Sequence, residues 1–219
     1  KLKSILTTPL CGSNQIKIKQ KKTVSKYGKY IIASGQIIEE KGVEFIIKSF
    51  AFYKKEYKDK SLNLVLVGPI QRPIYKIKLL ELIDSLKLKN SVYILGNLNF
   101  KAYFSILSKS QIGLSLYPNV SSYYYCSPTK CIDYMMAGIP VIGNKEVRDQ
   151  FSMLKKSNSG ILVSHDKKLI GKCINFLINN NSLRKKMGSN GKAWISKNRE
   201  YSLIANRIDK KYRSLIIQK

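Results

Sequence analysis

The chain has 219 residues, 44% of them hydrophobic, which is enough for one well-buried core and excludes an intrinsically disordered protein. Its net charge of +27 favours an anionic partner, namely nucleic acid, anionic lipid or a phosphorylated substrate, although an AT-rich genome would enrich lysine without any such partner. Because the four cysteines form no CxxC pair or Cys/His cluster and no apolar run approaches the roughly 18 residues of a membrane span, we expect a cytoplasmic protein with at most peripheral membrane contact.

The first part of the chain is entirely basic, because its first acidic residue is Glu39. We interpret residues 1–28 as a basic N-terminal arm or interdomain connector and residues 29–219 as one domain. The chain begins with Lys1 and not with methionine, so we expect a fragment whose upstream partner domain is missing.

From Tyr30 onward, short apolar runs alternate with amphipathic stretches whose apolar residues recur three and four positions apart. In one of these stretches Ile77, Leu80 and Ile83 are expected to face the core. Strands are expected at Tyr30–Ala33, Leu62–Val67, Ser91–Leu95, Ile112–Tyr117, Pro140–Ile142 and Ile161–Val163. Helices are expected at Val43–Tyr57, Ile74–Leu86, Phe100–Leu107, Pro128–Ala137, Lys168–Ile178, Leu183–Ser196 and Ser202–Ile217. This alternation predicts an α/β fold with a doubly wound, Rossmann-like parallel sheet, helices on both faces and a helical C-terminal part.

Ligands of such sheets bind beyond the carboxyl ends of the strands, and the first candidate loop there is Ser34–Gly42, SGQIIEEKG. Gly35 permits close backbone approach to a ligand, and the amide of Gln36 can donate hydrogen bonds. Lys41 stands where the next helix starts, a place unfavourable for a cation unless an anion binds there. The alternative is that Glu39 and Glu40 simply neutralise this lysine.

The second candidate segment is Ser127–Gly143, SPTKCIDYMMAGIPVIG. Ser127 is a good N-cap and Pro128 suits the first helical position, so the free amides of this helix and its dipole would attract an anion. Lys130 adds positive charge in the first turn. Asp133 lies on the same helix face, where its carboxylate can accept hydrogen bonds from a vicinal diol. The alternative is a surface ion pair between these last two residues on an ordinary helix.

Together the two segments resemble signatures of glycosyltransferase family 4, the group 1 enzymes with the two-domain GT-B fold. The first resembles G-[RK]-L-xxx-KG and the second resembles SPxKxxEYMxAGxPVI. Val65–Gly68 and Val92–Gly96 are similar to the family's IVG and VxFLG elements, and Tyr201–Leu215 looks like the terminal helix that crosses back to the other domain. The resemblance covers about residues 30–217 and implies the C-terminal, donor-binding half of such an enzyme.

The resemblance implies roles for individual residues. Lys41 and Lys130 would stabilise the departing diphosphate, and Asp133 would hold the ribose hydroxyls in place of a glutamate. Gln36 stands where an arginine usually contacts the diphosphate, and Tyr125 stands where a glutamate usually contacts the donor sugar. Sugar contact then either differs or shifts to Tyr123, Tyr124 or Ser127, unless the tyrosines form only a packed loop. The other expected donor-binding residues are Gly35, Gly96, Asn97, Pro128 and Thr129.

The resemblance further implies a retaining, hexosyltransferase-type enzyme that transfers a sugar from a nucleotide-diphosphate sugar to a glycan or lipid-linked acceptor in surface polysaccharide or lipopolysaccharide synthesis. No cofactor and no metal are expected, since the six aspartates include no Asp-x-Asp pair. No catalytic residue is assigned, because the family's catalytic histidine lies in the N-terminal domain and His165 is expected in a turn or cap.

The expected partners are the nucleotide sugar, the acceptor, the missing N-terminal domain and an anionic membrane surface, with no nucleic acid because no recognisable motif for it is present. Two other interpretations remain open. The charge and the basic arm would suit a polyanion-binding module. The departures at Gln36 and Tyr125 would suit a non-catalytic binder of sugar nucleotides.

Overall fold

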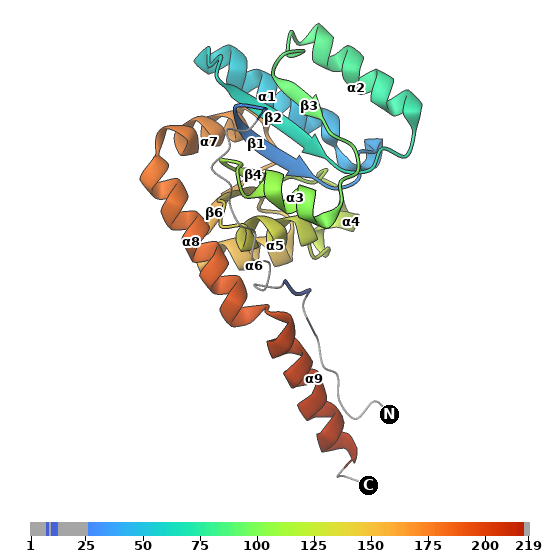
Figure 1. Ribbon diagram of the computed structural model, residues 1–219, viewed down its shortest axis with the longest axis vertical. Helices are drawn as coiled ribbons and strands as arrows, with labels where there is room; N and C mark the ends of the chain where they lie inside the picture. The colour runs from blue at the N-terminus through green and yellow to red at the C-terminus, as the bar shows by residue number, and fades with distance from the viewer. Residues whose placement is uncertain (1–7, 9, 13–25, 217–219) are drawn as a thin grey trace.

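The computed structural model describes residues 8, 10–12 and 26–216, and these form one six-stranded parallel sheet in the order β3-β2-β1-β4-β5-β6 (Figure 1). The strands are β1 (Lys29–Ser34), β2 (Leu62–Val67), β3 (Val92–Ile94), β4 (Gly113–Ser115), β5 (Val141–Asn144) and β6 (Gly160–Val163). The predicted doubly wound sheet is therefore confirmed. The strand order reverses between β1 and β4, which makes that junction the topological switch point where ligands of such sheets bind.

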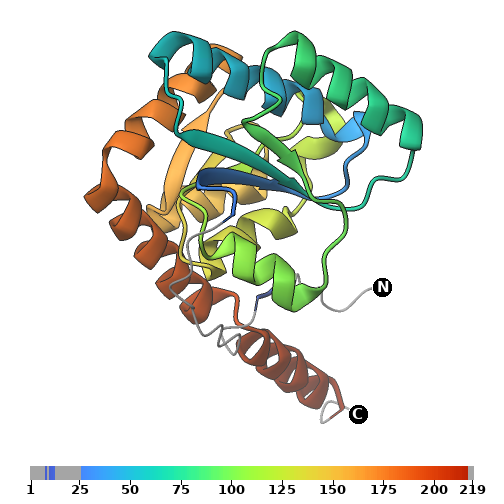
Figure 2. The ribbon, with the colours of Figure 1, turned by 45° about the horizontal axis from the view of Figure 1, so that its top comes forward.

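Both faces of the sheet are buried, so its strands read as continuous apolar runs. Along β1, Ile31 and Ala33 join the core on one face, whereas Tyr30 and Ile32 join the core on the other. The first face is covered by α1 (Val43–Tyr57), α2 (Pro73–Ser85) and α7 (Lys167–Asn179). The second is covered by α3 (Phe100–Leu107), α5 (Thr129–Met136), α6 (Arg148–Ser157) and α8 (Asn181–Asn198) (Figure 2).

The two halves of the sheet meet along a short seam. Six residues of β1 pair with six residues of β2, but β1 pairs with β4 only through Ile32 and Gly113. A Cβ at Gly113 would lie 2.3 Å from the ring of Tyr134, so α5 packs directly on the backbone of β4. This close packing brings the start of α5 near the carboxyl end of β1.

The last helix, α9 (Tyr201–Ile216), runs away from the body of the domain (Figure 1). Where it begins, the chain meets residues from the basic arm: the Gly12 N–H donates to the Arg199 carbonyl at 2.8 Å, and the Tyr201 N–H donates to the Gly12 carbonyl at 3.2 Å. A Cβ at Gly12 would lie 2.0 Å from Sδ of Met136. This part of residues 1–28 therefore lies against α5 and the α8–α9 junction, whereas most of the predicted arm falls outside the described residues.

The prediction for the buried side of α2 is partly wrong. Ile77 and Leu80 are 52% and 48% exposed, and Tyr75 and Leu79 pack into the core with Ile83. Apolar residues occur on almost every side of this helix, so their spacing alone does not fix which side faces the sheet.

Two α-helices were not predicted, namely α6 and the single turn α4 (Ser121–Tyr124). The buried side of α6 includes Gln150 and Ser157, which interrupt the apolar pattern, while Phe151 is 37% exposed. Both side chains donate hydrogen bonds: the Gln150 amide donates to the Asn144 carbonyl at 3.0 Å, and the Ser157 hydroxyl donates to the Met153 carbonyl at 2.7 Å, while Oε1 of Gln150 has no partner among the described residues. Such partners make burial of polar side chains tolerable, and they are not visible in a hydrophobicity pattern.

Candidate functional site

Two adjoining cavities open at the switch point of the sheet, and we call them together the cleft. The first, of about 290 Å³, includes Lys41 and Tyr117 in its wall. The second, of about 380 Å³, includes Asn97, Tyr103 and Asp133. Both cavities share Ser34, Gly35, Gln36, Thr129 and Lys130. Seven of the predicted donor-binding residues line the cleft: Gly35, Gln36, Lys41, Asn97, Thr129, Lys130 and Asp133.

Glycines shape the floor of the cleft. Gly35 has φ +125° and Gly68 has φ +151°, values that L side chains rarely adopt. A Cβ at Gly68 would lie 1.8 Å from the Gly35 carbonyl oxygen, whereas a Cβ at Gly35 would meet nothing within 4 Å. Gly96, at φ +65°, accepts a 2.8 Å hydrogen bond from the Gly68 N–H and holds the turn that carries Asn97. The backbone at Gly35 is therefore fixed from below and open toward the cleft.

Lys41 ends the 3-10 helix η1 (Glu39–Lys41), which closes at Gly42 with φ +68°. Its ammonium lies 5.0 Å from the ring centroid of Tyr123. Among the described residues, neither neighbouring glutamate forms an ion pair with Lys41, because each has a different partner. The side chain of Glu39 lies 2.6 Å from Nζ of Lys78, and that of Glu40 lies 3.9 Å from Nη1 of Arg72.

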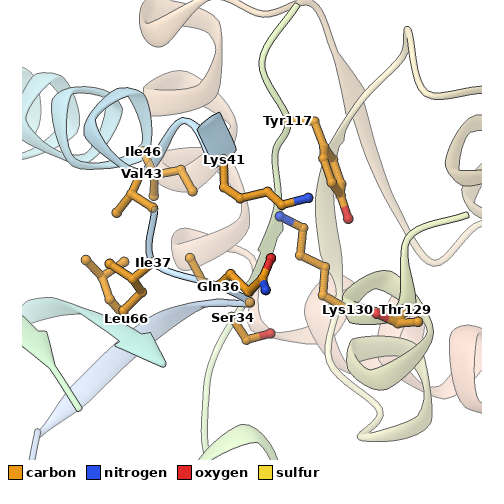
Figure 3. A pocket seen from close by; sticks show the side chains of 12 residues that line it. Ser34, Gln36, Ile37, Lys41, Val43, Ile46, Leu66, Tyr117, Thr129 and Lys130 are labelled. Carbon is orange, nitrogen blue, oxygen red and sulfur yellow. The ribbon is translucent and has the colours of Figure 1, made fainter. Parts of the chain in front are cut away.

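Lys130 projects from the first turn of α5 into the same cavity, and its ammonium and that of Lys41 point toward one another (Figure 3). The Lys130 ammonium donates to the Leu116 carbonyl at 3.0 Å and lies 3.9 Å from the ring centroid of Tyr117. Burial, and then the charge of Lys41, lower the pKa of Lys130 to about 7. Two ammonium groups facing each other create a local excess of positive charge that an anion in the cavity would offset.

The N-terminus of α5 differs from the prediction. The helix begins at Thr129 with Pro128 as its N-cap residue, and no side chain caps it. The predicted N-cap, Ser127, donates its hydroxyl to Asp149 instead. Asp149 is held by Arg199, whose Nη1 lies 3.0 Å from Oδ2, so this carboxylate is a fixed, strong acceptor that orients the Ser127 hydroxyl toward itself. The first amides of α5 thus lack a side-chain cap at the wall of the cleft.

Asp133 lies on the same side of α5, in the second cavity. The alternative of a surface ion pair between Lys130 and Asp133 is wrong, because Asp133 is largely enclosed and accepts a 3.1 Å hydrogen bond from the Tyr103 hydroxyl. Burial raises the pKa of Asp133 to about 6, and the hydrogen bond from Tyr103 opposes that rise. Tyr103 was not predicted, because a tyrosine on a short helix gives no signal of a contact formed 30 residues away.

Tyr125 does not line the cleft. Its side chain is 71% exposed and stacks with the Arg148 guanidinium at 4.4 Å from the ring centroid. Its neighbour Tyr123 packs against Tyr117 with ring centroids 5.3 Å apart and donates its hydroxyl to the Glu40 carbonyl at 2.7 Å. The tyrosines between β4 and α5 therefore pack around the rim, consistent with the packed-loop interpretation.

His165 lies between β6 and α7, in the turn where it was expected. Its ring stacks on Phe45 with centroids 3.6 Å apart, and its Nδ1 lies 3.4 Å from the Asn144 amide nitrogen. Burial lowers the pKa of His165, which favours the neutral imidazole. The following residue, Asp166, caps α7 by accepting from the Lys168 and Leu169 amides.

Among residues 8, 10–12 and 26–216, no helix combines the length and the apolar character needed to span a bilayer. Within the same ranges, no three His, Cys, Asp or Glu side chains gather in a way that could hold a metal ion.

Comparisons with known proteins identify the family and the fold. The model of the family described as "Glycosyl transferases group 1" matches residues 14–194. A relative in Methanocaldococcus jannaschii, the uncharacterized glycosyltransferase MJ1069, is 28% identical over 182 residues, which are 80% of this chain and 44% of the relative.

Two solved structures share the fold. Anabaena HepE in complex with UDP and glucose superposes with a TM-score of 0.72 at 18% identity, over 86% of this chain and 49% of HepE. The C-terminal domain of LpcC, a group 1 glycosyl transferase from Francisella tularensis, superposes with a TM-score of 0.70 at 17% identity, over 87% of this chain and 99% of that domain.

The chain spans about half the length of MJ1069 and HepE, and its fold corresponds to the Rossmann-like half of a GT-B enzyme. The family model covers most of the chain, including both loops that build the cleft. The chain therefore belongs to the group 1 glycosyl transferases.

Proposed function

We propose that this chain is the donor-binding half of a retaining, family 4 glycosyltransferase that takes a sugar from a nucleotide-diphosphate sugar. One observation carries the proposal. Lys41 and Lys130 converge on a cavity that continues, past the open backbone of Gly35, into a second cavity with a carboxylate, Asp133. A nucleoside diphosphate has the matching sequence of groups, with anionic phosphates next to a vicinal diol.

Each end of the cleft then binds one part of the donor. Lys41, Lys130 and the uncapped amides of α5 would bind the diphosphate through charge and hydrogen bonds. Gln36 would add an amide donor without adding charge. Asp133 would accept hydrogen bonds from the ribose hydroxyls, with the nucleobase near Asn97.

The proposed chemistry relies on electrostatic stabilisation. Breaking the bond between the sugar and the phosphate leaves negative charge on the departing diphosphate. Lys41 and Lys130, already fixed beside that position, would stabilise this charge more in the transition state than in the bound donor, which lowers the barrier. These lysines would serve in place of a metal ion.

Relatives suggest the donor and the pathway to test first. HepE was solved with UDP and glucose, and WaaG, another structure with the same fold, is described as involved in lipopolysaccharide biosynthesis. We therefore take a UDP-sugar as the first candidate donor and surface polysaccharide or lipopolysaccharide synthesis as the pathway. The acceptor, a glycan or a lipid-linked sugar, would meet the donor together with an N-terminal domain at the cytoplasmic face of the membrane, where the basic surface would contact anionic lipid.

A second candidate function is sugar-nucleotide binding without transfer. It is favoured by Tyr125, which takes the place of a sugar-contacting carboxylate and stacks on Arg148 outside the cleft. Transfer assays with the full-length protein separate the two functions. Donor binding without transfer to any acceptor would support the second.

The test of donor binding is calorimetric titration of the chain with UDP-, GDP- and ADP-sugars. We expect one of them to bind, and Lys41→Ala and Asp133→Asn each to weaken binding about 10- to 100-fold, the loss typical of a hydrogen bond to a charged group. Lys76→Ala is the matched control, since this lysine lies on the exposed side of α2 and should leave affinity unchanged. If no nucleotide sugar binds, or if both cleft variants bind as well as the parent, the proposal is wrong.

A further inference from the structure

Four polar side chains from three elements form a continuous hydrogen-bonded series, and three of them, Ser34, Tyr103 and Asp133, line the second cavity. The hydroxyl of Tyr134 lies 3.0 Å from the hydroxyl of Ser34, which lies 2.9 Å from that of Tyr103, which in turn donates to Asp133 at 3.1 Å. Ser34 ends β1, Tyr103 lies on α3, and the other two residues lie on α5. This series of hydrogen bonds thus begins at the Tyr134 hydroxyl and ends on the Asp133 carboxylate.

The direction of this hydrogen-bonded series follows from its carboxylate end. The backbone N–H of Ser34 donates to the Tyr134 hydroxyl at 2.8 Å, and the Tyr134 proton has two acceptors in reach, Oγ of Ser34 at 3.0 Å and the Leu114 carbonyl at 3.4 Å. At the carboxylate end an ionised Asp133 can only accept, so Tyr103 must donate to it and must accept from Ser34. Each hydroxyl in such a series polarises the next and strengthens the final bond to the carboxylate.

The hydrogen bond from Tyr103 also determines which oxygen of Asp133 is available to a ligand. Tyr103 occupies one side of Oδ2, and no hydrogen bond from the described residues engages Oδ1. Aspartate is one methylene shorter than glutamate, so its carboxylate cannot move far to meet a ligand. Fixing one oxygen against α3 therefore fixes where the other oxygen faces the second cavity.

We propose that Tyr103 is a positioning residue that holds Asp133 oriented and ionised, so that its free oxygen accepts a hydrogen bond from a vicinal diol of the donor. This inference rests on the proposed function and adds to it a residue that determines recognition of the ribose. Tyr103 acts through Asp133.

The charge state of Asp133 depends on few neighbours. The titratable groups that face it are Tyr103 from α3 and Tyr134 and Cys131 from α5. The ammonium of Lys130, one turn earlier, is directed to the Leu116 carbonyl. Burial raises the pKa of Asp133 to about 6 despite the Tyr103 hydrogen bond, so loss of that bond would raise the pKa further. At neutral pH a larger fraction of Asp133 would then be protonated and unable to accept two hydrogen bonds.

The test compares the binding of UDP-glucose and its 2′-deoxyribose analogue by wild type and Tyr103→Phe between about pH 5 and pH 8. In wild type we expect UDP-glucose affinity to fall as the pH drops through about 6, where Asp133 becomes protonated. In Tyr103→Phe the midpoint of this fall should move to higher pH. At pH 7 the affinity should drop at least about threefold, and the preference for UDP-glucose over the analogue should shrink.

Controls separate positioning from damage to the fold. Tyr93→Phe removes a hydroxyl that makes a 3.4 Å contact with the Asn90 carbonyl, away from the cleft, and should leave the pH profile unchanged. Ser34→Ala removes the hydroxyl that precedes Tyr103 in the hydrogen-bonded series, so the midpoint of the fall in affinity should again move to higher pH. This variant keeps the test valid if Tyr103→Phe does not fold. An unchanged midpoint in a folded Tyr103→Phe protein would overturn the role of Tyr103 and leave donor binding intact. A failure of wild type to bind any nucleotide sugar would instead overturn the proposed function, and this inference with it.

Discussion

The ammonium of Lys130 is enclosed by Tyr117, the Leu116 carbonyl and the ammonium of Lys41. This environment disfavours a positive charge in the empty cleft and lowers the pKa of Lys130 to about 7. A bound diphosphate would reverse the balance, because an anion within a few ångströms of a lysine favours its protonated form. Donor binding should therefore be accompanied by uptake of a proton at Lys130.

This coupling predicts that the affinity for UDP-glucose falls as the pH rises above about 7, because Lys130 must then gain a proton for tight binding. With the fall at low pH expected from Asp133, the affinity should be highest between about pH 6 and pH 7. Calorimetry in buffers of different ionisation enthalpy, at about pH 8, measures the proton uptake directly.

A substitution at Lys41 tests whether Lys130 is the group that causes the fall in affinity at high pH. Lys41→Met removes the neighbouring positive charge, so the pKa of Lys130 should rise and the fall in affinity should begin at a higher pH, even though overall binding weakens. Lys76→Met, on the exposed side of α2, should change neither the profile nor the affinity. An affinity independent of pH between about 7 and 9 in wild type would contradict the role given to Lys130.

At the scale of elements, one ion pair connects the start of α5 to the junction of α8 and α9. Asp149 accepts from Ser127 on one side and from Arg199 on the other, and Arg199 is 8% exposed. The Arg199 carbonyl in turn accepts from Gly12. Segments far apart in the sequence thus share a single carboxylate, whose pKa is held low by Arg199 and Ser127 despite its burial.

Loss of this pair should be costly. Arg199→Met leaves Asp149 partly buried without its counter-ion, and we expect the free energy of unfolding to fall by about 2 kcal/mol in urea titrations, somewhat less than for a fully buried pair. The matched control is Arg213→Met, which breaks the exposed pair with Asp209 on α9 and should cost no more than about 0.5 kcal/mol. Equal losses in the two variants would show that the enclosed pair contributes nothing special.

The same elements show what the sequence could predict and what it could not. The six strands were predictable because each coincides with a short apolar run, and the loops beyond β1 and β4 were recognisable by their glycines, lysines and the Ser-Pro helix start. The buried side of α2 was not predictable, because the apolar residues of this helix are spread around its whole circumference. The hydrogen-bond partners of Ser127 and Asp133 were not predictable either. Asp149 reaches Ser127, and Tyr103 reaches Asp133, only through tertiary packing. The roles of Gln36 and Tyr125 stay predictions.

At the scale of the whole molecule, the cleft draws its residues from both halves of the sheet. Gly35, Gln36 and Lys41 follow β1 in the first half, whereas Lys130 and Asp133 lie on α5 in the second. A ligand that binds all of them would connect the halves across the place where the sheet itself is least paired. Its binding energy would therefore oppose any separation of the two halves.

Hydrogen exchange can measure this effect at the seam. The Ile32 amide donates to the Ile112 carbonyl at 2.9 Å, across the β1–β4 junction. If this amide exchanges by opening of the seam, UDP-glucose at 100 times its dissociation constant should slow its exchange by about 100-fold. Amides between β2 and β3, such as that of Leu64 bonded to the Ser91 carbonyl at 2.8 Å, should be slowed less. Equal protection at both places would contradict the prediction.

The β1–β4 junction has a consequence for the rigidity of the domain. It holds one paired position, Ile32 with Gly113, and two backbone hydrogen bonds, from the Gln111 amide to the Tyr30 carbonyl and from the Ile32 amide to the Ile112 carbonyl. Under the proposed function, a donor bound in the cleft would add contacts on both sides of this junction. The domain would then be more rigid with the nucleotide sugar bound than after the spent nucleotide departs.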